Sequence, residues 1–536
     1  MNHFSVFTIL YLTAFLCEMA ENWKHPGFAA AFLVIICAIA FTRITRLKFF
    51  IFLIASTAYI LLFRFPEVAN HVNFILLVNL TLIVGIAYSW LRPTWQDADF
   101  FEMIKPPLRL SMVLVYFFTG FHKFNQDFFH PQASCIDEFL SQFVWLLDRS
   151  RVLFVPTILI LLAAGSLLYA RLFGNPLRRF SGIVQSGIWV GIAIAAVFLG
   201  QLIGSTHDLI QARFPAPLIL LVAGTVILWE IIGSLMLLFP KTQALMLAFS
   251  LAMHASFALI GFVDFSALAV ALLFTFIPPA YLNVLDQRPS VRIGGVATVS
   301  RAHAYLSILL VGFFFGGIHH KIYPIYGPKI LTALFISGMF FLVATIVFYW
   351  PILVRLCAAN RLPWTGVPLL SSASTTAQSG QGHRALVLFS ASIILLFGLS
   401  PYLGLRTAGT FSMFSNLKTE GEYSNHFLLG QNQLKLWGYQ EDVVEVLEID
   451  DETARLGHKY RPLKGYKLPV VEFRKLVHKW TEANYTVPIR FVHNGVEYAS
   501  ADIVNDPTWK TPNRTWETYL MDFRIIQPDG ANQCRW

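Results

Sequence analysis

Residues 106–129 read PPLRLSMVLVYFFTGFHKFNQDFF, an apolar and aromatic run that ends at Gly120, Phe121, His122 and Lys123 before the chain turns polar. A run of this length and composition is typical of a helix that crosses a bilayer. Two basic side chains at its end raise the question of what they bind. The rest of the chain supplies the context for an answer.

The composition of the whole chain is that of a membrane protein. Of its 536 residues, 56% are hydrophobic and 13% are charged, whereas soluble domains average about 25% charged residues. The mean hydropathy is +0.59. Apolar runs of about 20 residues, the length that spans a bilayer, recur as far as residue 402. We therefore predict a polytopic α-helical membrane protein with about 12–13 spans.

The distribution of charge divides the chain into two predicted domains. About a quarter of residues 403–536 are charged, against less than about a tenth of residues 1–402. We expect residues 1–402 to form a helical transmembrane body and residues 403–536 a small soluble α+β domain. In this tail, VVEVLEID is strand-like, VVEFRKLVHKWTEAN fits an amphipathic helix, and Asn494-Gly495 predicts a hairpin turn between two strands.

Basic residues in the short loops predict the orientation of the body. The candidate spans are residues 4–20, 27–43, 48–65, 71–91, 107–122, 152–170, 181–203, 216–239, 242–262, 264–284, 303–319, 330–353 and 384–402. One alternate set of loops holds most of the Arg and Lys residues, which favours a cytoplasmic location for that set. With an odd number of spans, the tail then lies on the extracytoplasmic side, in a periplasm, a lumen or outside the cell.

Charge and cysteine content limit the partners of the chain. The net charge of +9 fits loops that face anionic lipid. The sequence shows no basic patch interleaved with aromatic residues, so we do not expect it to bind nucleic acid. The five cysteines show no metal-ligand spacing, so we expect no metal site. Cys135 and Cys534 lie in the same compartment in this topology, and Cys135 begins an amphipathic stretch that suits an interfacial helix. The two cysteines either form a disulfide or remain free thiols.

Polar side chains occur at or near the predicted outer ends of four spans. They are Asn70, His71, His122, Lys123, His254, His319, His320 and Lys321. Ionisable groups within a span indicate a functional site, and His254 lies ~12 Å from the outer end of its span at 1.5 Å per residue. Alternatively, the terminal residues anchor their helices at the headgroups, and a neutral His254 bonds between helices. Glu230, expected in the inner half of its span, is either a structural acid or a supporting group.

Several of these residues lie in segments that resemble a known family. GFHKFNQDF (120–128) resembles the lysine signature of vitamin K-dependent γ-glutamyl carboxylases and of the wider HTTM (horizontally transferred transmembrane) proteins. NHVNFILLVNLTLIV resembles the Asn-His span of that family, and MHASFALIGFVDFSALAVALLFTFIPP its histidine-containing stretch. The resemblance is clearest over residues 60–285. GLRTAGTFSMFSNLKTEGEYSNHFLL and the final CRW resemble segments that follow the membrane body in bacterial HTTM proteins.

The resemblance implies a reaction and a set of residues. It implies a lyase and epoxidase that couples oxygenation of a reduced vitamin K-type (menaquinol-like) naphthoquinone by O2 to carboxylation of a glutamate side chain with CO2. The glutamate would belong to a peptide or protein. Lys123, His71 and His254 would be catalytic, and Asn70, His122, Glu230, His319, His320 and Lys321 would support them. Lys123 must then be uncharged, which we expect from burial beside other basic groups.

The chain also departs from the family signature. His122 stands where the family has the first lysine of a pair, and Asn125 and Phe128 replace its acid and tryptophan. Two other functions therefore remain open: a non-catalytic HTTM membrane partner protein, and a small-solute transporter whose polar residues line a solute path.

Overall fold

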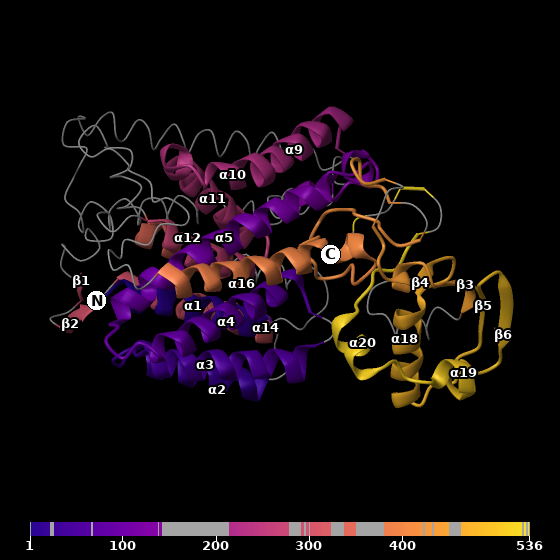
Figure 1. Cartoon of the computed structure of the whole chain (residues 1–536), viewed down its shortest axis with the longest axis horizontal. Coiled ribbons are helices and arrows are strands. Elements are labelled where there is room, and N and C mark those ends of the chain that lie inside the picture. Colours follow the sequence, from indigo (N-terminus) through magenta and orange to yellow (C-terminus); the bar gives the residue numbers. More distant parts are fainter. Residues whose placement is uncertain are drawn as a thin grey trace.

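A computed structural model shows a bundle of long helices followed by a smaller part that contains a β-sheet (Figure 1). The described residues are 2–21, 26–65, 68–137, 139–141, 214–277, 291–293, 296–299, 301–322, 337–349, 380–421, 424–430, 434–449, 463–527, 530–531 and 534. The predicted spans 152–170 and 181–203 lie outside them.

The helical body is built from these elements. Its described helices are α1 (His3–Glu21), α2 (Pro26–Ala40), α3 (Arg46–Tyr59), η1 (Ile60–Arg64), α4 (Asn70–Trp90), α5 (Asp97–Lys123), η2 (Asp127–Phe129), α9 (Ala216–Leu228), η4 (Trp229–Gly233), α10 (Ser234–Met236), α11 (Pro240–Leu259), α12 (Val263–Leu273), η5 (Phe274–Phe276), α14 (Arg301–Ile322), a helix at Ser337–Tyr349, α16 (Gly380–Leu399) and η7 (Ser400–Leu403). A short antiparallel hairpin, which the sequence analysis did not predict, pairs β1 (Val291–Ile293) with β2 (Val296–Val299).

Five of the described helices are long and apolar enough to cross a membrane. They are Arg46–Arg64, Asn70–Trp90, Ala216–Met236, Pro240–Leu259 and His383–Leu403. Every other predicted span among the described residues also contains a helix, either a shorter apolar one or, for residues 107–122, the longer α5. These helices indicate a membrane protein, and the total of 13 spans stays a prediction.

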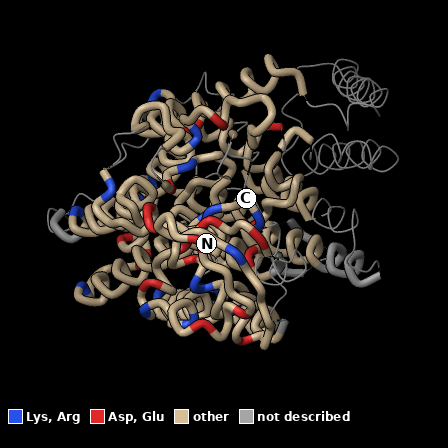
Figure 2. Tube along the Cα trace, turned by 90° about the vertical axis from the view of Figure 1, so that its right-hand side faces the viewer, with Lys and Arg blue, Asp and Glu red and all other residues tan. Residues whose placement is uncertain are grey.

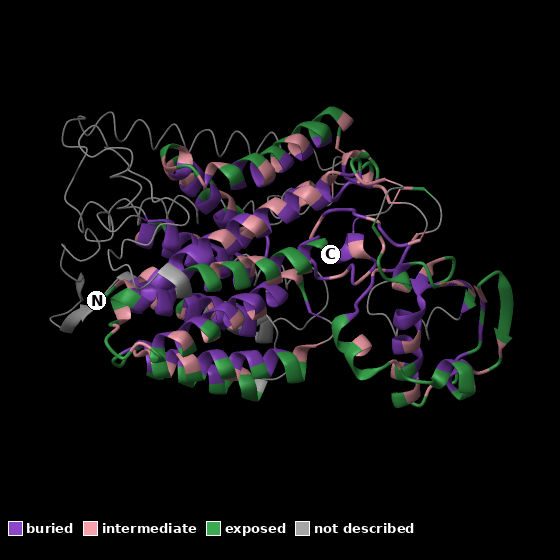
Figure 3. Cartoon of the chain, viewed as in Figure 1, coloured by how far each residue is buried: buried purple, intermediate pink, exposed green. Residues whose placement is uncertain are grey.

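The outer surface of the bundle is apolar. Side chains such as Leu62, Leu221 and Leu388 are about two-thirds exposed on η1, α9 and α16, and the exposed residues of these helices face away from the bundle (Figure 3). Along the trace, charged residues are separated by long uncharged stretches (Figure 2). Apolar patches this extensive on a folded protein mark a surface that something else covers, as is typical of a membrane protein.

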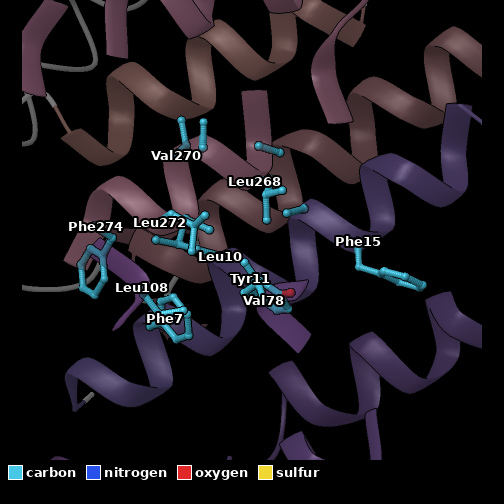
Figure 4. Close-up of a cluster of buried hydrophobic side chains, with 14 of the residues drawn as sticks. Phe7, Leu10, Tyr11, Phe15, Val78, Leu108, Leu268, Val270, Leu272 and Phe274 are labelled. Atoms are coloured by element: carbon cyan, nitrogen blue, oxygen red, sulfur yellow. The ribbon is translucent and has the colours of Figure 1, made fainter. Parts of the chain in front are cut away.

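Helices α1, α4, α5 and α12 form the centre of the bundle. Their buried apolar side chains belong to one continuous cluster, part of which is drawn in Figure 4. Some of the polar side chains inside it form hydrogen bonds with one another: the Tyr11 hydroxyl donates to Asn79 Oδ1 at 2.7 Å, and the Asn79 amide donates to Ser56 and Thr57. Such bonds remove the cost of burying polar groups in an apolar medium.

Helix α5 runs from the end of the bundle that carries the basic loops to the end that lies beside the tail. Near its start, Arg46 of α3 contacts Asp97 at 3.1 Å. Within the helix, the buried Arg109 donates from Nε to the carbonyl of Thr275 at 2.7 Å. Because these charged groups have partners, α5 can pack at the centre of the bundle although it carries more charged residues than the neighbouring helices. Its last residue, Lys123, lies at the end of the bundle that faces the tail (Figure 1).

The tail contains a four-stranded antiparallel sheet in the order β4-β3-β5-β6. Its elements are η8 (Gly438–Gln440), β3 (Val443–Ile449), β4 (Lys467–Pro469), α18 (Val470–Glu482), β5 (Ile489–His493), β6 (Val496–Ser500), η9 (Ile503–Asn505), α19 (Pro507–Lys510) and α20 (Thr515–Leu520). The predicted strand, helix and hairpin are present. Asn494 and Gly495 both have positive φ, at 50° and 74°, as a type I′ turn requires. The short strand β4 was not predicted.

Residues 404–421 and 424–430, hereafter the roof segment, cross from the helical body to the tail over the end of α5. Asn125 and His426 form an isolated antiparallel bridge. The Asn125 side chain also donates to the carbonyl of Ser415 at 2.5 Å. The chain end is held at the same place, because Cys135 and Cys534 form a disulfide. Of the two alternatives that the sequence allowed for these cysteines, the structure shows the bonded one.

Candidate functional site

A cavity lies between the ends of α4, α5 and η4 and the roof segment. Its lining residues are Asn70, His71, Phe74, Val115, Tyr116, Thr119, Lys123, Phe128, Cys135, Ile136, Phe139, Val226, Trp229, Glu230, Met253, Phe257, Phe262, Phe265, Phe411, Met413 and Phe414. Most of these side chains are apolar or aromatic, and a few are polar. This combination is typical of pockets that bind small apolar molecules with a defined orientation.

The main charged feature of the cavity is an ion pair. Lys123, the last residue of α5, places its Nζ 2.8 and 2.9 Å from the two carboxylate oxygens of Glu230. Both side chains are more than nine-tenths buried. A pair held this deeply in an apolar wall interacts far more strongly than a surface pair, because little water screens it.

Gly120 allows the two helices to come close enough for this pair. A Cβ atom at Gly120 would lie 2.8 Å from Cβ of Glu230 and 2.8 Å from Cγ1 of Ile231. Contacts that short are essentially forbidden, so any larger residue would push η4 away from α5. One turn of helix separates Gly120 from Lys123, which explains why a glycine precedes the basic residues at the end of this span.

The expected depth of Glu230 is wrong. The sequence placed it in the inner half of its span and Lys123 at the outer end, but the two side chains meet. Helix α9 begins beyond the end of α5: it packs on η2, and the backbone N–H of Phe214 donates to Asp137 at 3.2 Å. Its register is therefore shifted along the bundle relative to the predicted one, so Glu230 lies level with Lys123.

The expected surroundings of Lys123 are also different. We expected other basic groups beside it, and the structure places a carboxylate there instead. The neighbouring His122 points away from the cavity: its Nδ1 lies 2.7 Å from the Tyr402 hydroxyl and its Nε2 lies 3.0 Å from the Thr410 carbonyl. His122 therefore ties α5 to η7 and the roof segment, and its role here is structural.

His254 reaches the cavity through another residue. It is fully buried in α11, and its Nε2 lies 2.6 Å from the hydroxyl of Tyr116. Tyr116 lines the cavity one turn before Gly120, whereas His254 itself lies behind it. The geometry makes His254 a positioning residue for Tyr116.

His71 and Asn70 line the cavity at the start of α4. His71 Nε2 lies 2.9 Å from Glu18 Oε2 and 2.6 Å from Asp264 Oδ2. Asn70 accepts a hydrogen bond from the backbone N–H of Ser412 at 3.0 Å, which connects α4 to the roof segment. Two of the sequence-predicted residues are thus fixed at the cavity wall.

The remaining predicted residues are only partly placed. His319, His320 and Lys321 belong to the last turns of α14, and their side chains lie outside what the structure describes. Of the other predicted residues, Asn70, His71, Lys123 and Glu230 line one cavity, His254 is one side chain removed from it, and His122 points away from it.

Several lining residues were not predicted from the sequence. Tyr116 and Thr119 were read as part of an apolar span, although their spacing from Lys123 puts them on the same helix face. Phe411 and Phe414 come from the roof segment with positive φ values of 63° and 53°. A backbone conformation that non-glycine residues rarely adopt is stored strain, which is frequent at functional sites. No local pattern in the sequence reveals it.

The arrangement is suited to proton abstraction from an apolar ligand. Aromatic rings such as Phe74, Phe128 and Trp229 can stack on a bicyclic ring, while Lys123 and Glu230 present a proton acceptor to one edge of it.

A search of family models gives no match to this chain, and searches of curated proteins and of solved structures give no significant match either.

Proposed function

We propose that this chain is an integral-membrane carboxylase that resembles the vitamin K-dependent γ-glutamyl carboxylases and belongs among the HTTM proteins. One observation carries the proposal: the lysine of the family-like segment lines a largely aromatic cavity, bonded to a carboxylate. The cofactor would be a reduced naphthoquinone, and the reactants O2, CO2 and a glutamate-containing peptide. When bound, the quinol supplies with O2 the oxidative step that generates a base strong enough for the γ-carbon of glutamate.

The Lys123–Glu230 pair provides the first proton acceptor. The two groups are hydrogen-bonded at 2.8 Å, close enough for a proton to pass between them. When this proton is on Glu230, the Lys123 amine is neutral and can take the hydroxyl proton of the quinol on its Nζ. The carboxyl group of Glu230 would then lose its proton to solvent water, which restores the original ion pair. Transfer from the quinol to Lys123 leaves the net charge of the cavity unchanged, and loss of the Glu230 proton changes it by one unit, which limits the electrostatic cost.

The other polar groups of the cavity orient the ligand. Tyr116 lines the cavity, and its hydroxyl is fixed 2.6 Å from Nε2 of His254. His71 is fixed by two carboxylates. Positioned groups of this kind stabilise developing charge without having to reorganise during the reaction. The apolar walls exclude water, which would otherwise quench a strongly basic species.

We further propose that the tail is extracytoplasmic. The basic residues of the first loops, among them Arg43, Arg46 and Arg92, lie at the end of the bundle where α5 begins, and basic loops favour the cytoplasm. The tail packs at the other end. The Cys135–Cys534 disulfide supports this orientation, because disulfides persist in oxidising compartments.

The activity is tested with purified protein in lipid nanodiscs. Reduced naphthoquinone, O2, bicarbonate and a short glutamate peptide are supplied, and quinone epoxide and carboxylated peptide are measured by mass spectrometry. We expect both products, each dependent on quinol and O2, and loss of both in Lys123→Ala. Absence of both from folded wild-type protein that binds the quinol would contradict the proposal and favour a non-catalytic partner protein or a transporter.

A further inference from the structure

Three buried side chains converge beside the cavity from three different helices. Glu18 lies near the end of α1, His71 in the first turn of α4, and Asp264 in the first turn of α12. The two carboxylates are about 1% exposed, and the imidazole is about one-tenth exposed. The packing of α1 against α12 and of α12 against α4 brings them together.

The three residues are of the types that ligate metal ions, and they lie close enough together to share one ion. One atom from each residue lies within 4.8 Å of the others. The His71 nitrogen is 2.9 Å from the Glu18 oxygen and 2.6 Å from the Asp264 oxygen. Around a zinc ion with bonds of about 2.0–2.1 Å, neighbouring ligand atoms lie about 3.3 Å apart. Small side-chain movements therefore make room for an ion between the three atoms.

Electrostatics favour a cation at this point. Two carboxylates directed at one position in an apolar bundle repel each other, and a positive charge between them removes that cost. Arg64 contacts the other oxygen of Glu18, Oε1, at 2.5 Å, so Oε2 remains directed at the common position. An arginine bonded to a ligating carboxylate is a typical outer partner that fixes the orientation of the ligand.

The site is also open on one side. His71 and its neighbour Asn70 line the cavity, so the position between the three ligands borders the space in which a small molecule would bind. Three protein ligands with one position left for water or substrate are typical of catalytic zinc sites. One nitrogen and two carboxylate oxygens suit zinc and other first-row divalent ions better than calcium, which takes oxygen ligands.

We propose that Glu18, His71 and Asp264 bind a first-row divalent metal ion, of which Zn²⁺ is the best fit, at the edge of the cavity. The sequence predicted no metal site, because the three ligands come from distant segments that no spacing motif connects. The proposal does not rest on the carboxylase function: the ion would act as a Lewis acid towards any oxygen-bearing ligand in the cavity.

The test measures bound metal and not activity. Untagged protein in nanodiscs is stripped with a chelator and titrated with Zn²⁺, and the bound zinc is counted by elemental mass spectrometry. We expect one tightly bound ion per chain, with affinity lowered at least tenfold in Glu18→Gln and Asp264→Asn. Glu102→Gln is the matched control, since Glu102 pairs with Lys105 elsewhere in the bundle and should leave binding unchanged.

A second measurement keeps the proposal open to refutation if the variants misfold. Wild-type protein loaded with Co²⁺ should show the visible absorption bands of a four- or five-coordinate nitrogen–oxygen site, which Zn²⁺ abolishes by competition. Failure of the wild type to bind either ion at one per chain, or equal binding by folded Glu18→Gln and Asp264→Asn, would overturn the proposal. The cluster would then be held by a proton on His71 shared between the two carboxylates.

Discussion

At the scale of single residues, Gly120 controls the distance between Lys123 and Glu230. Gly120→Ala places a methyl group 2.8 Å from the side chains of Glu230 and Ile231, so η4 must shift away from α5. We expect a loss of ~1–3 kcal/mol in stability, the usual cost of overpacking, and a weakened ion pair. Epoxide formation should fall together with the midpoint of thermal unfolding.

A second glycine on the neighbouring helix provides the control for this variant. Gly224 of α9 has nothing within 4 Å of the position of an added Cβ atom, and alanine has the higher helix propensity. Gly224→Ala should therefore leave activity and thermal midpoint equal to or slightly above those of the wild type. Equal effects of the two substitutions would show that close approach at Gly120 is unimportant.

Glu230 is expected to matter through the proton that it shares. Glu230→Gln keeps the size and the hydrogen-bond acceptor of the side chain but cannot take a proton from Lys123. We expect the rate of epoxide formation to fall ~10- to 1,000-fold, as for other losses of acid–base function, with quinol binding changed much less. A binding isotherm alongside the rate separates the two effects, and an unchanged rate would remove Glu230 from the mechanism.

His426 predicts a pH dependence of stability outside the membrane. Its Nδ1 accepts from the backbone N–H groups of Leu428 and Leu429, and its Nε2 donates to the Phe121 carbonyl. Burial, the main cause, lowers the pKa of His426 from its usual value of 6.5. A proton therefore binds the unfolded chain more readily, so the stabilisation is complete above about pH 6.5 and is lost as pH falls below it.

Thermal midpoints of wild type and His426→Gln between pH 8 and pH 5 measure this contribution. The wild type should lose stability in the acidic part of that range more steeply than the variant, whose side chain does not titrate. Parallel curves for the two proteins would show that His426 does not contribute to the acid sensitivity.

At the scale of elements, the roof segment joins the helical body to the tail, and the disulfide fixes the chain end beside it. Cys135 and Cys534 are 399 residues apart in the sequence. A cross-link that closes so long a loop restricts the unfolded chain strongly.

Cys534→Ala should therefore lower stability by ~2–5 kcal/mol. The variant Cys37→Ala is the control, because Cys37 is a free, partly exposed cysteine of α2. Its thermal midpoint should match that of the wild type. A midpoint for Cys534→Ala that also equals the wild-type value would indicate that the bond does not hold the tail in place.

The sequence predicted elements better than it predicted how they meet. Apolar runs located the long described helices of the body, because bilayer thickness fixes the length of such runs. The Asn494-Gly495 turn located the hairpin of the tail, because few residues adopt positive φ at both positions. The relative register of α5 and α9, which decides the depth of Glu230, depends on packing between distant segments and was missed. The path of the roof segment was also not predicted, because its sequence has no repeating pattern.

At the scale of the whole molecule, the proposed topology places the cavity and the tail on the same side of the membrane. Exposed cysteines introduced at Arg43 and at Lys510 in a Cys37→Ala background report on the two ends. In an intact bacterial host, a membrane-impermeant maleimide should label Lys510→Cys and leave Arg43→Cys unlabelled until the cells are opened. The reverse pattern would show that the whole body has the opposite orientation, and identical labelling of the two positions would show that the span count is wrong by an odd number.

Clustering of the polar residues could be anticipated at this scale, but their pairing could not. Positive-inside counting placed His71, Lys123 and His254 in one half of the bilayer, and the structure brings them to one cavity or next to it. Their partners Glu18, Asp264 and Tyr116 come from other helices. Only the packed bundle shows them, because no local sequence rule joins residues across helices.

The central claim is that Lys123 is the proton acceptor of a quinol-dependent reaction. Lys105 offers a matched control: it lies on the same helix, is 1% exposed and pairs with Glu102, but does not line the cavity. The deciding measurement is the rate of epoxide formation per folded molecule for Lys123→Ala and Lys105→Ala in nanodiscs. We predict a loss of at least ~100-fold for Lys123→Ala and a near wild-type rate for Lys105→Ala. Wild-type turnover by folded Lys123→Ala protein would contradict the account.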